Sequence, residues 1–355
     1  MCSAGAIKQA LTNWWLKWLI PISKEWLNKK DRDVTDIAAS YSLDGKRVWV
    51  AGHGGLVGSA LVKRLASERC ELVSVGHSQL DLRRQSDVED WLAETRPSAI
   101  FVAAATVGGI HANDVRPADF LYDNMMIEAN IVHAAWRVGV EKLLFLGSTC
   151  IYPKFAPQPM AEDDLMTGPL EPTNQWYALA KIAGIYLCQA YRRQHGCNFI
   201  SAMPTNLFGP GDYFDAENSH VIPALMDKIH KAREDNLVDV DIWGSGEPYR
   251  EFLYSEDAAD ALIFLMKRYT GASQVNVGTG EELKIIEIAR LIADIVGYCG
   301  TWKFDASRQD GPPRKLADSR LLNALGWTPR VGLRDGLQAT YDWFRESYAA
   351  GQLRV

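Results

Sequence analysis

Tyr177 and Lys181 are spaced so that, in a helix, their side chains lie on one face. A tyrosine hydroxyl with its ordinary pKa of about 10 is a poor acid–base catalyst near neutral pH. A neighbouring cation stabilises the phenolate and so lowers that pKa. The pair therefore indicates ketone reduction or alcohol oxidation with a nicotinamide cofactor.

A thiol accompanies this pair. Cys150 follows Ser148 and Thr149 at the end of an apolar run, where one hydroxyl could bind the oxygen of a substrate ketone. A thiolate beside that ketone could remove a proton from an adjacent carbon. His220, in a polar loop before an apolar segment, is the candidate acid that returns the proton to the opposite face. A buried cysteine and a surface histidine are the ordinary alternatives.

These residues need a scaffold of strands and helices. Apolar strands expected at 46–51, 71–76, 99–104, 143–146 and 199–203 alternate with helices at 59–67, 88–94, 120–138 and 177–195. Such alternation predicts an α/β fold with a Rossmann-type doubly wound parallel sheet. We expect a dinucleotide-binding domain over 45–204, its sheet completed by later segments. Residues 205–355, with short strands near 238–243 and 274–277, should form mainly a smaller substrate-binding lobe.

A glycine-rich turn connects the first expected strand to the first helix. Gly52, Gly55 and Gly58 allow a tight turn, close approach of the backbone to a pyrophosphate and close helix packing. An acidic residue after the second strand would favour NAD, and an arginine would favour NADP. The stretch 75–78 contains neither, so these residues leave the choice open.

Composition limits the partners and the compartment. The net charge of −6 gives no electrostatic argument for binding nucleic acid. The six cysteines are scattered and form no metal-binding cluster with histidine, which favours a reducing cytoplasm without disulfides or metal.

The first 44 residues form a tryptophan-rich extension. Leu11, Trp14, Trp15, Trp18 and Ile22 recur at helical spacing, but Lys17 interrupts the apolar run, so it is too short to span a membrane. This segment is an amphipathic anchor at a membrane surface, a helix packed on the main domain or on a partner, or a non-essential extension.

Several segments together are similar to one family. They are Ala51–Gly58, Ala103–Ile110, Asn124–Glu128, Gly147–Pro153, Pro204–Pro210, Trp243–Gly246 and Arg250–Leu253. Over about residues 45–350 the chain resembles the extended short-chain dehydrogenase/reductase family. Within it, the chain looks like the bifunctional members that epimerise C3 and C5 of GDP-4-keto-6-deoxymannose and then reduce C4 with NADPH, giving GDP-L-fucose.

The resemblance implies a role for each matching residue. Tyr177 would protonate the C4 oxygen, Lys181 would tune Tyr177 and hold the ribose, and Ser148 would bind the carbonyl oxygen. Cys150 would be the base and His220 the acid of epimerisation. Implied NADP(H) contacts are Gly52, His53, Gly54, Gly55, Leu56, Val57, Gly58, Leu146, Gly147, Tyr177, Lys181, Pro204, Thr205, Asn206, Leu207 and His220. Implied GDP-sugar contacts are Asn206, Lys228, Trp243, Arg250 and Asp310.

The resemblance also implies a homodimer formed through the helices near 120–138 and 177–195. Gly54 stands where many bacterial members have arginine, and Thr106 stands where some have lysine. We therefore expect His77 and Ser78 to contact the 2′-phosphate instead.

Two alternatives remain open from the residues. A nucleotide-sugar 4,6-dehydratase or 4-epimerase with bound NAD shares this fold, but the former needs carboxylates after Ser148-Thr149 and the latter has no use for Cys150 with His220. A cofactor-binding scaffold without activity would not need both Tyr177 and Lys181.

Overall fold

The structure is a computed structural model that describes residues 40–215, 219–308 and 310–354. The predicted amphipathic segment of the tryptophan-rich extension lies outside the described residues. Within the described part of the chain, no helix is long and apolar enough to cross a membrane.

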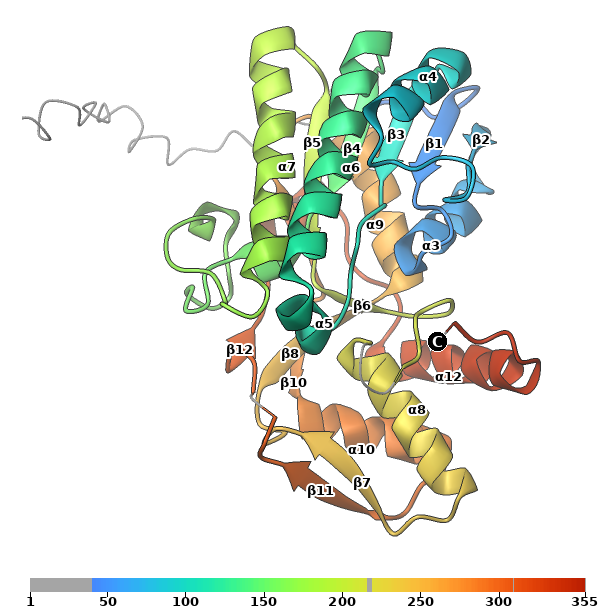
Figure 1. The fold of residues 1–355 in the computed structure, drawn as a ribbon, viewed down its shortest axis with the longest axis vertical. Coiled ribbons are helices and arrows are strands. Elements are labelled where there is room, and N and C mark those ends of the chain that lie inside the picture. The colour runs from blue at the N-terminus through green and yellow to red at the C-terminus, as the bar shows by residue number, and fades with distance from the viewer. Residues whose placement is uncertain (1–39, 216–218, 309, 355) are drawn as a thin grey trace, which may run out of the picture. The chain divides into compact units, whose positions relative to one another are not determined.

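A six-stranded parallel sheet lies between two layers of helices, which confirms the predicted Rossmann-type α/β fold (Figure 1). Its strands, in spatial order, are β2 (Glu71–Val73), β1 (Arg47–Ala51), β3 (Ala99–Val102), β4 (Lys142–Leu146), β5 (Phe199–Pro204) and β9 (Val275–Val277). The chain goes from β1 outward to β2 and returns on the other side of β1 as β3. This reversal creates the switch point at which open α/β sheets bind ligands.

Helices cover both faces of this sheet (Figure 1). Helices α3 (Leu56–Leu65) and α9 (Ser255–Arg268) lie on one face, and α4 (Gln85–Thr95), α6 (Pro117–Val138) and α7 (Gln175–His195) lie on the other. Alternate residues of β1 enter the two cores: Val48 and Val50 face the first, Trp49 and Ala51 the second. Burial on both sides explains why the strands are continuous apolar runs.

A third apolar core belongs to the later part of the chain. It is built by α8 (Val221–Glu234), α10 (Ile285–Val296) and α12 (Leu333–Ala349), with β7 (Asp239–Trp243) paired to β11 (Thr301–Asp305). A small sheet is formed by β10 (Glu282–Lys284), β8 (Tyr249–Tyr254) and β12 (Arg314–Lys315), and β6 (Asn206–Phe208) also pairs with β8. The sequence pattern did not predict β6, β8, β10, β11 or β12. Most of them are too short to show a clear alternation.

The carboxylate of Glu251, in the middle of β8, connects three separate segments. Oε1 accepts the backbone N–H groups of Thr279 at 2.6 Å and Gly280 at 2.8 Å, and Oε2 accepts that of Ala317 at 2.8 Å. The residue is fully buried. A Cβ on Gly278 would lie 2.3 Å from Oε1, so glycine leaves room for the carboxylate. Glu251 therefore connects β8 to the turn after β9 and to the segment after β12.

Replacing Glu251 by glutamine should destabilise the protein by about 2 kcal/mol or more, because an amide nitrogen would face backbone donors that need an acceptor. Urea unfolding followed by circular dichroism measures this loss. The control is Glu247→Gln, whose exposed carboxylate pairs only with Lys284 among the described residues and should change stability by less than about 0.5 kcal/mol. Equal stability of the two variants would show that the Glu251 network carries no weight.

Candidate active site

The glycine-rich turn between β1 and α3 has the shape of a phosphate cradle. Gly52 has a φ of 85°, and a Cβ there would lie 2.6 Å from the backbone nitrogen of Ala104. A Cβ on Gly58 would lie 2.0 Å from the carbonyl oxygen of Gly52. Gly55, the N-cap of α3, offers no side chain to the first free N–H groups of the helix. The turn therefore fits a dinucleotide diphosphate, which those N–H groups can bind.

The other predicted cofactor residues lie in two groups. His53, Gly54, Leu56 and Val57 lie in the same turn or the first turn of α3. Leu146, Gly147, Pro204, Thr205, Asn206 and Leu207 lie at the carboxyl ends of β4 and β5 and at the start of β6. These ends adjoin the same edge of the parallel sheet, where cofactors of such folds bind.

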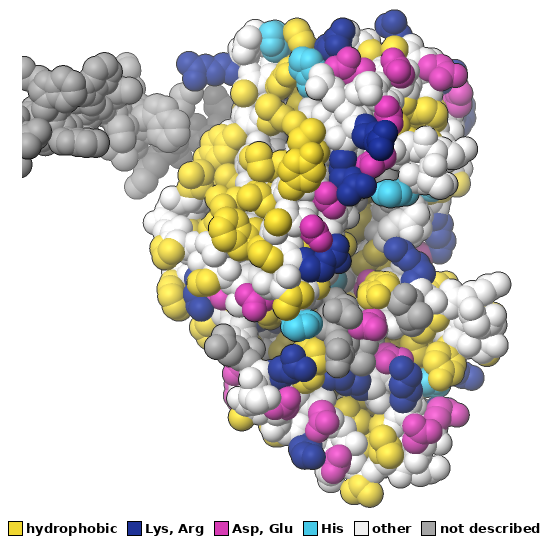
Figure 2. Space-filling view, in the orientation of Figure 1, with side chains coloured by type: hydrophobic (Ala, Val, Ile, Leu, Met, Phe, Trp, Pro, Cys, Tyr) yellow, Lys and Arg dark blue, Asp and Glu magenta, His cyan; other side chains and the backbone are white. Residues whose placement is uncertain are grey.

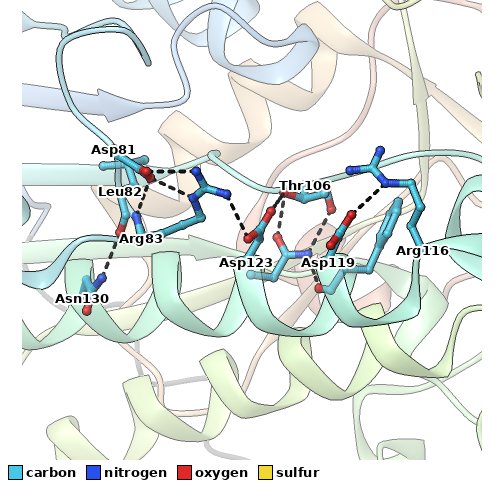
Figure 3. Close-up of polar contacts among 10 residues, drawn as sticks. Asp81, Leu82, Arg83, Thr106, Arg116, Asp119, Asp123 and Asn130 are labelled. Carbon is cyan, nitrogen blue, oxygen red and sulfur yellow. Dashed lines mark hydrogen bonds and ion pairs between the residues drawn. The ribbon is translucent and has the colours of Figure 1, made fainter.

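The loop after β3 is fixed to α6 (Figure 3). The backbone N–H of Thr106 donates to Asn124 Oδ1 at 2.9 Å, and Asn124 Nδ2 donates to the Thr106 carbonyl at 3.0 Å. The Thr106 hydroxyl donates to Asp123, which also binds Arg83 at 3.2 Å. Figure 3 shows Arg83 between Asp81 and Asp123. Helix α6 thus fixes this loop through two consecutive side chains.

Tyr177 and Lys181 lie one turn apart near the start of α7, as predicted. The Lys181 ammonium is 5.8 Å from the centre of the Tyr177 ring and 4.8 Å from that of Phe145. The expectation that the pKa of Tyr177 is lowered is wrong: burial raises it well above 10, and negative charge on Cys150 and Glu128 adds to this rise. Lys181 is 2.8 Å from Glu128 and both side chains are 2% exposed.

Ser148 and Cys150 form a tight turn directly after β4. Ser148 is the N-cap of the short 3₁₀ helix η1 (Thr149–Ile151), and its Oγ accepts the backbone N–H of Cys150 at 3.3 Å. The Cys150 side chain is half-buried. Helix η1 packs against α7, which carries Tyr177, so Cys150 and Tyr177 lie on neighbouring elements at the end of β4.

His220 is the N-cap residue of α8, and its side chain makes no capping bond. Part of the His220 surface is exposed to solvent. Desolvation by the surrounding protein nevertheless lowers the pKa of the imidazole. The structure gives no contact between His220 and Cys150, so their pairing stays a prediction.

Lys228 and Trp243, two of the predicted GDP-sugar contacts, lie against each other. The Lys228 ammonium lies 4.5 Å from the centre of the Trp243 ring, and the guanidinium of Arg308 lies 4.4 Å from it. Cations and an aromatic ring at one place suit a nucleoside diphosphate.

Arg250 and Asp310 are the other two predicted substrate residues. Burial lowers the pKa of Arg250 to about 10, and the charge of Asp310 opposes this change. Asp310 accepts the backbone N–H of Ser245 at 3.0 Å and the Ser245 hydroxyl at 2.6 Å. A Cβ on Gly244 would meet that carboxylate at 2.2 Å.

Three charged residues near the site were not predicted. Glu128 lies in Asn124–Glu128, one of the segments that resemble the family, but the resemblance implies no role for it. Lys315 pairs in register with Arg250; burial lowers its pKa, whereas its interaction with Cys150 raises it. Arg354 donates to the carbonyl of Gly54 at 3.0 Å and to that of Gly211 at 3.2 Å. Of these three residues, only Glu128 could have been found from the sequence, because its position falls on the buried face of helix α6.

The model of the NAD dependent epimerase/dehydratase family matches residues 48–278. The chain belongs to this family. It is 56% identical to the GDP-L-fucose synthase of Sinorhizobium fredii over 87% of this chain and 98% of the relative. It is 54% identical to GDP-L-fucose synthase 1 of Arabidopsis thaliana, over 86% and 95% respectively.

A solved structure supports the same relationship. The NADP-bound GDP-L-fucose synthetase of Naegleria fowleri superposes with a TM-score of 0.81 at 30% identity, covering 88% of this chain and 98% of that one. The family member described here therefore shares both fold and sequence with nucleotide-sugar enzymes.

Replacing Gly58 by alanine should weaken NADPH binding at least about tenfold, because the added methyl group collides with the Gly52 carbonyl and deforms the turn. Titration of NADPH fluorescence measures the dissociation constant. Gly332→Ala is the matched control, since a Cβ there meets only a side-chain oxygen at 3.9 Å. Native affinity in Gly58→Ala would contradict the assignment of this turn to the cofactor.

Proposed function

We propose that this protein converts GDP-4-keto-6-deoxymannose to GDP-L-fucose by epimerising C3 and C5 and then reducing C4 with NADPH. The observation that carries the proposal is the packing of η1, which contains Cys150, against α7, where Tyr177 lies one turn from Lys181. A reductase alone requires the tyrosine and lysine. The thiol beside the phenol adds a base for a second reaction at the same ketone.

Epimerisation uses the acidity of carbons next to the ketone. Cys150, as thiolate, removes the proton from C3 or C5, and the electrons move onto the C4 oxygen to form an enolate. Ser148 donates a hydrogen bond to that oxygen and limits its charge. His220 returns a proton to the opposite face. Lys315, which interacts with Cys150, supplies positive charge to this part of the site.

Reduction then uses the same carbonyl. NADPH, when bound, supplies hydride to C4. Tyr177 donates its proton to the C4 oxygen, and Lys181 stabilises the resulting phenolate. A Tyr177 with a raised pKa remains protonated at neutral pH, which suits an acid in the reducing direction.

NADP(H) is the cofactor we assign to the glycine-rich turn. The support comes from the turn's fit to a diphosphate and from the NADP-bound relative. His77 and Ser78 lie exposed after β2, where they can reach the adenosine ribose, and Arg354 brings a cation to Gly54. The GDP-sugar would contact Asn206, Lys228, Trp243, Arg250 and Asp310.

Two variants separate the two reactions. Cys150→Ser should lose deuterium exchange at C3 and C5 by about a hundredfold or more, since a hydroxyl is a far weaker base. Tyr177→Phe should lose NADPH oxidation by a similar factor but keep most of the exchange. Mass spectrometry of the sugar in D₂O and absorbance of NADPH give the two readouts. Exchange that persists in Cys150→Ser would remove Cys150 from this role.

A second copy of this chain is the partner we propose. Exposed apolar side chains gather over α6 and α7 (Figure 2). They are Tyr122, Met125, Trp176, Leu179 and Tyr186. On α7 they recur at helical spacing and form one face, which a two-fold related copy could cover with the same face.

The free cysteines of the described residues support a reducing compartment such as the cytoplasm.

Leu179→Glu should convert the dimer to monomer, because a carboxylate would be buried at the centre of that face. Sedimentation equilibrium measures the mass. Leu237→Glu, which changes an exposed leucine of the later lobe, is the matched control and should leave the mass unchanged. A native protein that is monomeric at micromolar concentration would exclude the dimer.

A further inference from the structure

Glu128 is a buried carboxylate that the reaction described above does not use. It lies in the middle of α6, and both its side chain and that of Lys181 are 2% exposed. Burial raises the pKa of the Glu128 carboxyl, whereas Lys181 acts in the opposite direction. A carboxylate at this depth is costly unless a cation compensates it.

The geometry joins Glu128 to Lys181 and to little else. Oε1 forms an ion pair with the lysine nitrogen at 2.8 Å, and neither carboxylate oxygen accepts a hydrogen bond of good geometry from a described residue. A Cβ on Gly184 would lie 2.6 Å from Oε2 and 2.4 Å from Phe145 Cζ. Glycine at this position of α7 therefore leaves space for the carboxylate beside Lys181.

An alternative explanation is that the pair simply stabilises the packing of α6 on α7. A buried ion pair is a poor source of stability, because desolvation of two charges consumes most of the attraction. An apolar pair would pack these helices as well. The position of the pair one turn from Tyr177 points to an electrostatic task.

We propose that Glu128 is a positioning residue for the reduction step: it holds the Lys181 ammonium in place and offsets part of its charge, so that Tyr177 keeps its proton until the ketone is reduced. This inference rests on the proposed function. Lys181 alone would favour the phenolate strongly. With Glu128 beside it, the lysine retains donors for the cofactor ribose and the phenol remains an acid.

The groups that act on Tyr177 come from several elements. Cys150 on η1 and Glu128 on α6 both disfavour the phenolate. A cation 5.8 Å from the ring centre, the Lys181 ammonium on α7, would favour it. Cys188, also on α7, is buried near Glu128, whose charge contributes to raising the pKa of that thiol. Lys315 acts on Cys150 from β12. Of the two groups that disfavour the phenolate directly, Glu128 is the one that can be neutralised without removing a proposed catalytic side chain.

The test is the pH profile of kcat for NADPH oxidation with GDP-4-keto-6-deoxymannose. Activity should fall at alkaline pH as Tyr177 loses its proton. In Glu128→Gln this limb should move to lower pH by about one unit, because the negative charge that disfavours the phenolate is gone. Glu128→Asp, which keeps the charge but lies further from Lys181, should shift the limb in the same direction by less.

Glu89→Gln is the matched control. It removes the same group from an ion pair 2.6 Å long with Arg137 of α6, so the limb should stay in place. An unmoved limb with uniformly lower kcat in Glu128→Gln would mean a structural role only and would overturn the proposal. A limb that moves to higher pH, as loss of the Lys181 proton would cause, would overturn it too.

Thermal melts of each variant show whether it folds. If Glu128→Gln does not fold, Glu128→Asp carries the test, and an unmoved or raised limb in that variant contradicts the inference. The activity of the native protein distinguishes a failure of the proposed function from a failure of the role proposed for Glu128. Absence of NADPH oxidation by the native protein would refute the proposed function, whereas native activity with an unmoved limb refutes only the role of Glu128.

Discussion

The carboxylate of Glu251 is the interaction on which the arrangement of the site depends. Its oxygens accept backbone N–H groups from the turn after β9 and from the segment after β12. The preceding residue, Arg250, and the register partner Lys315 are thereby held at one place beside Cys150. Strand β8 is thus fixed to the turn that follows β9, the edge strand of the six-stranded sheet. Substrate groups and catalytic groups can then meet at one ketone.

Charges at this edge divide the chemistry between two acid–base systems. Burial and the negative charges of Cys150 and Glu128 favour the protonated form of Tyr177. Cys150 also interacts with Lys315. In the proposed mechanism, Tyr177 retains a proton for the C4 oxygen, and Cys150 has a neighbouring positive charge that suits a thiolate base. The same ketone can serve both reactions without a second binding site.

The sequence was sufficient to predict the sheet and the placement of Tyr177 and Lys181 on one helix. Strands buried on both faces are apolar throughout, and Tyr177 with Lys181 needs only helical spacing to share a face. Contacts between distant segments could not be predicted. Glu128 reaches Lys181 because α6 packs on α7, and Arg354 reaches Gly54 from the other end of the chain. The small strands around β8 were missed because pairing, rather than local pattern, defines them.

The central claim is that one site both exchanges protons beside the ketone and reduces that ketone. The most direct measurement is mass spectrometry of GDP-4-keto-6-deoxymannose after incubation with the native protein in D₂O without NADPH. The account predicts deuterium at C3 and C5, because the base and the acid act before any hydride is supplied. A sugar that remains unlabelled, while NADPH is still oxidised when added, would contradict the account and leave a simple ketone reductase.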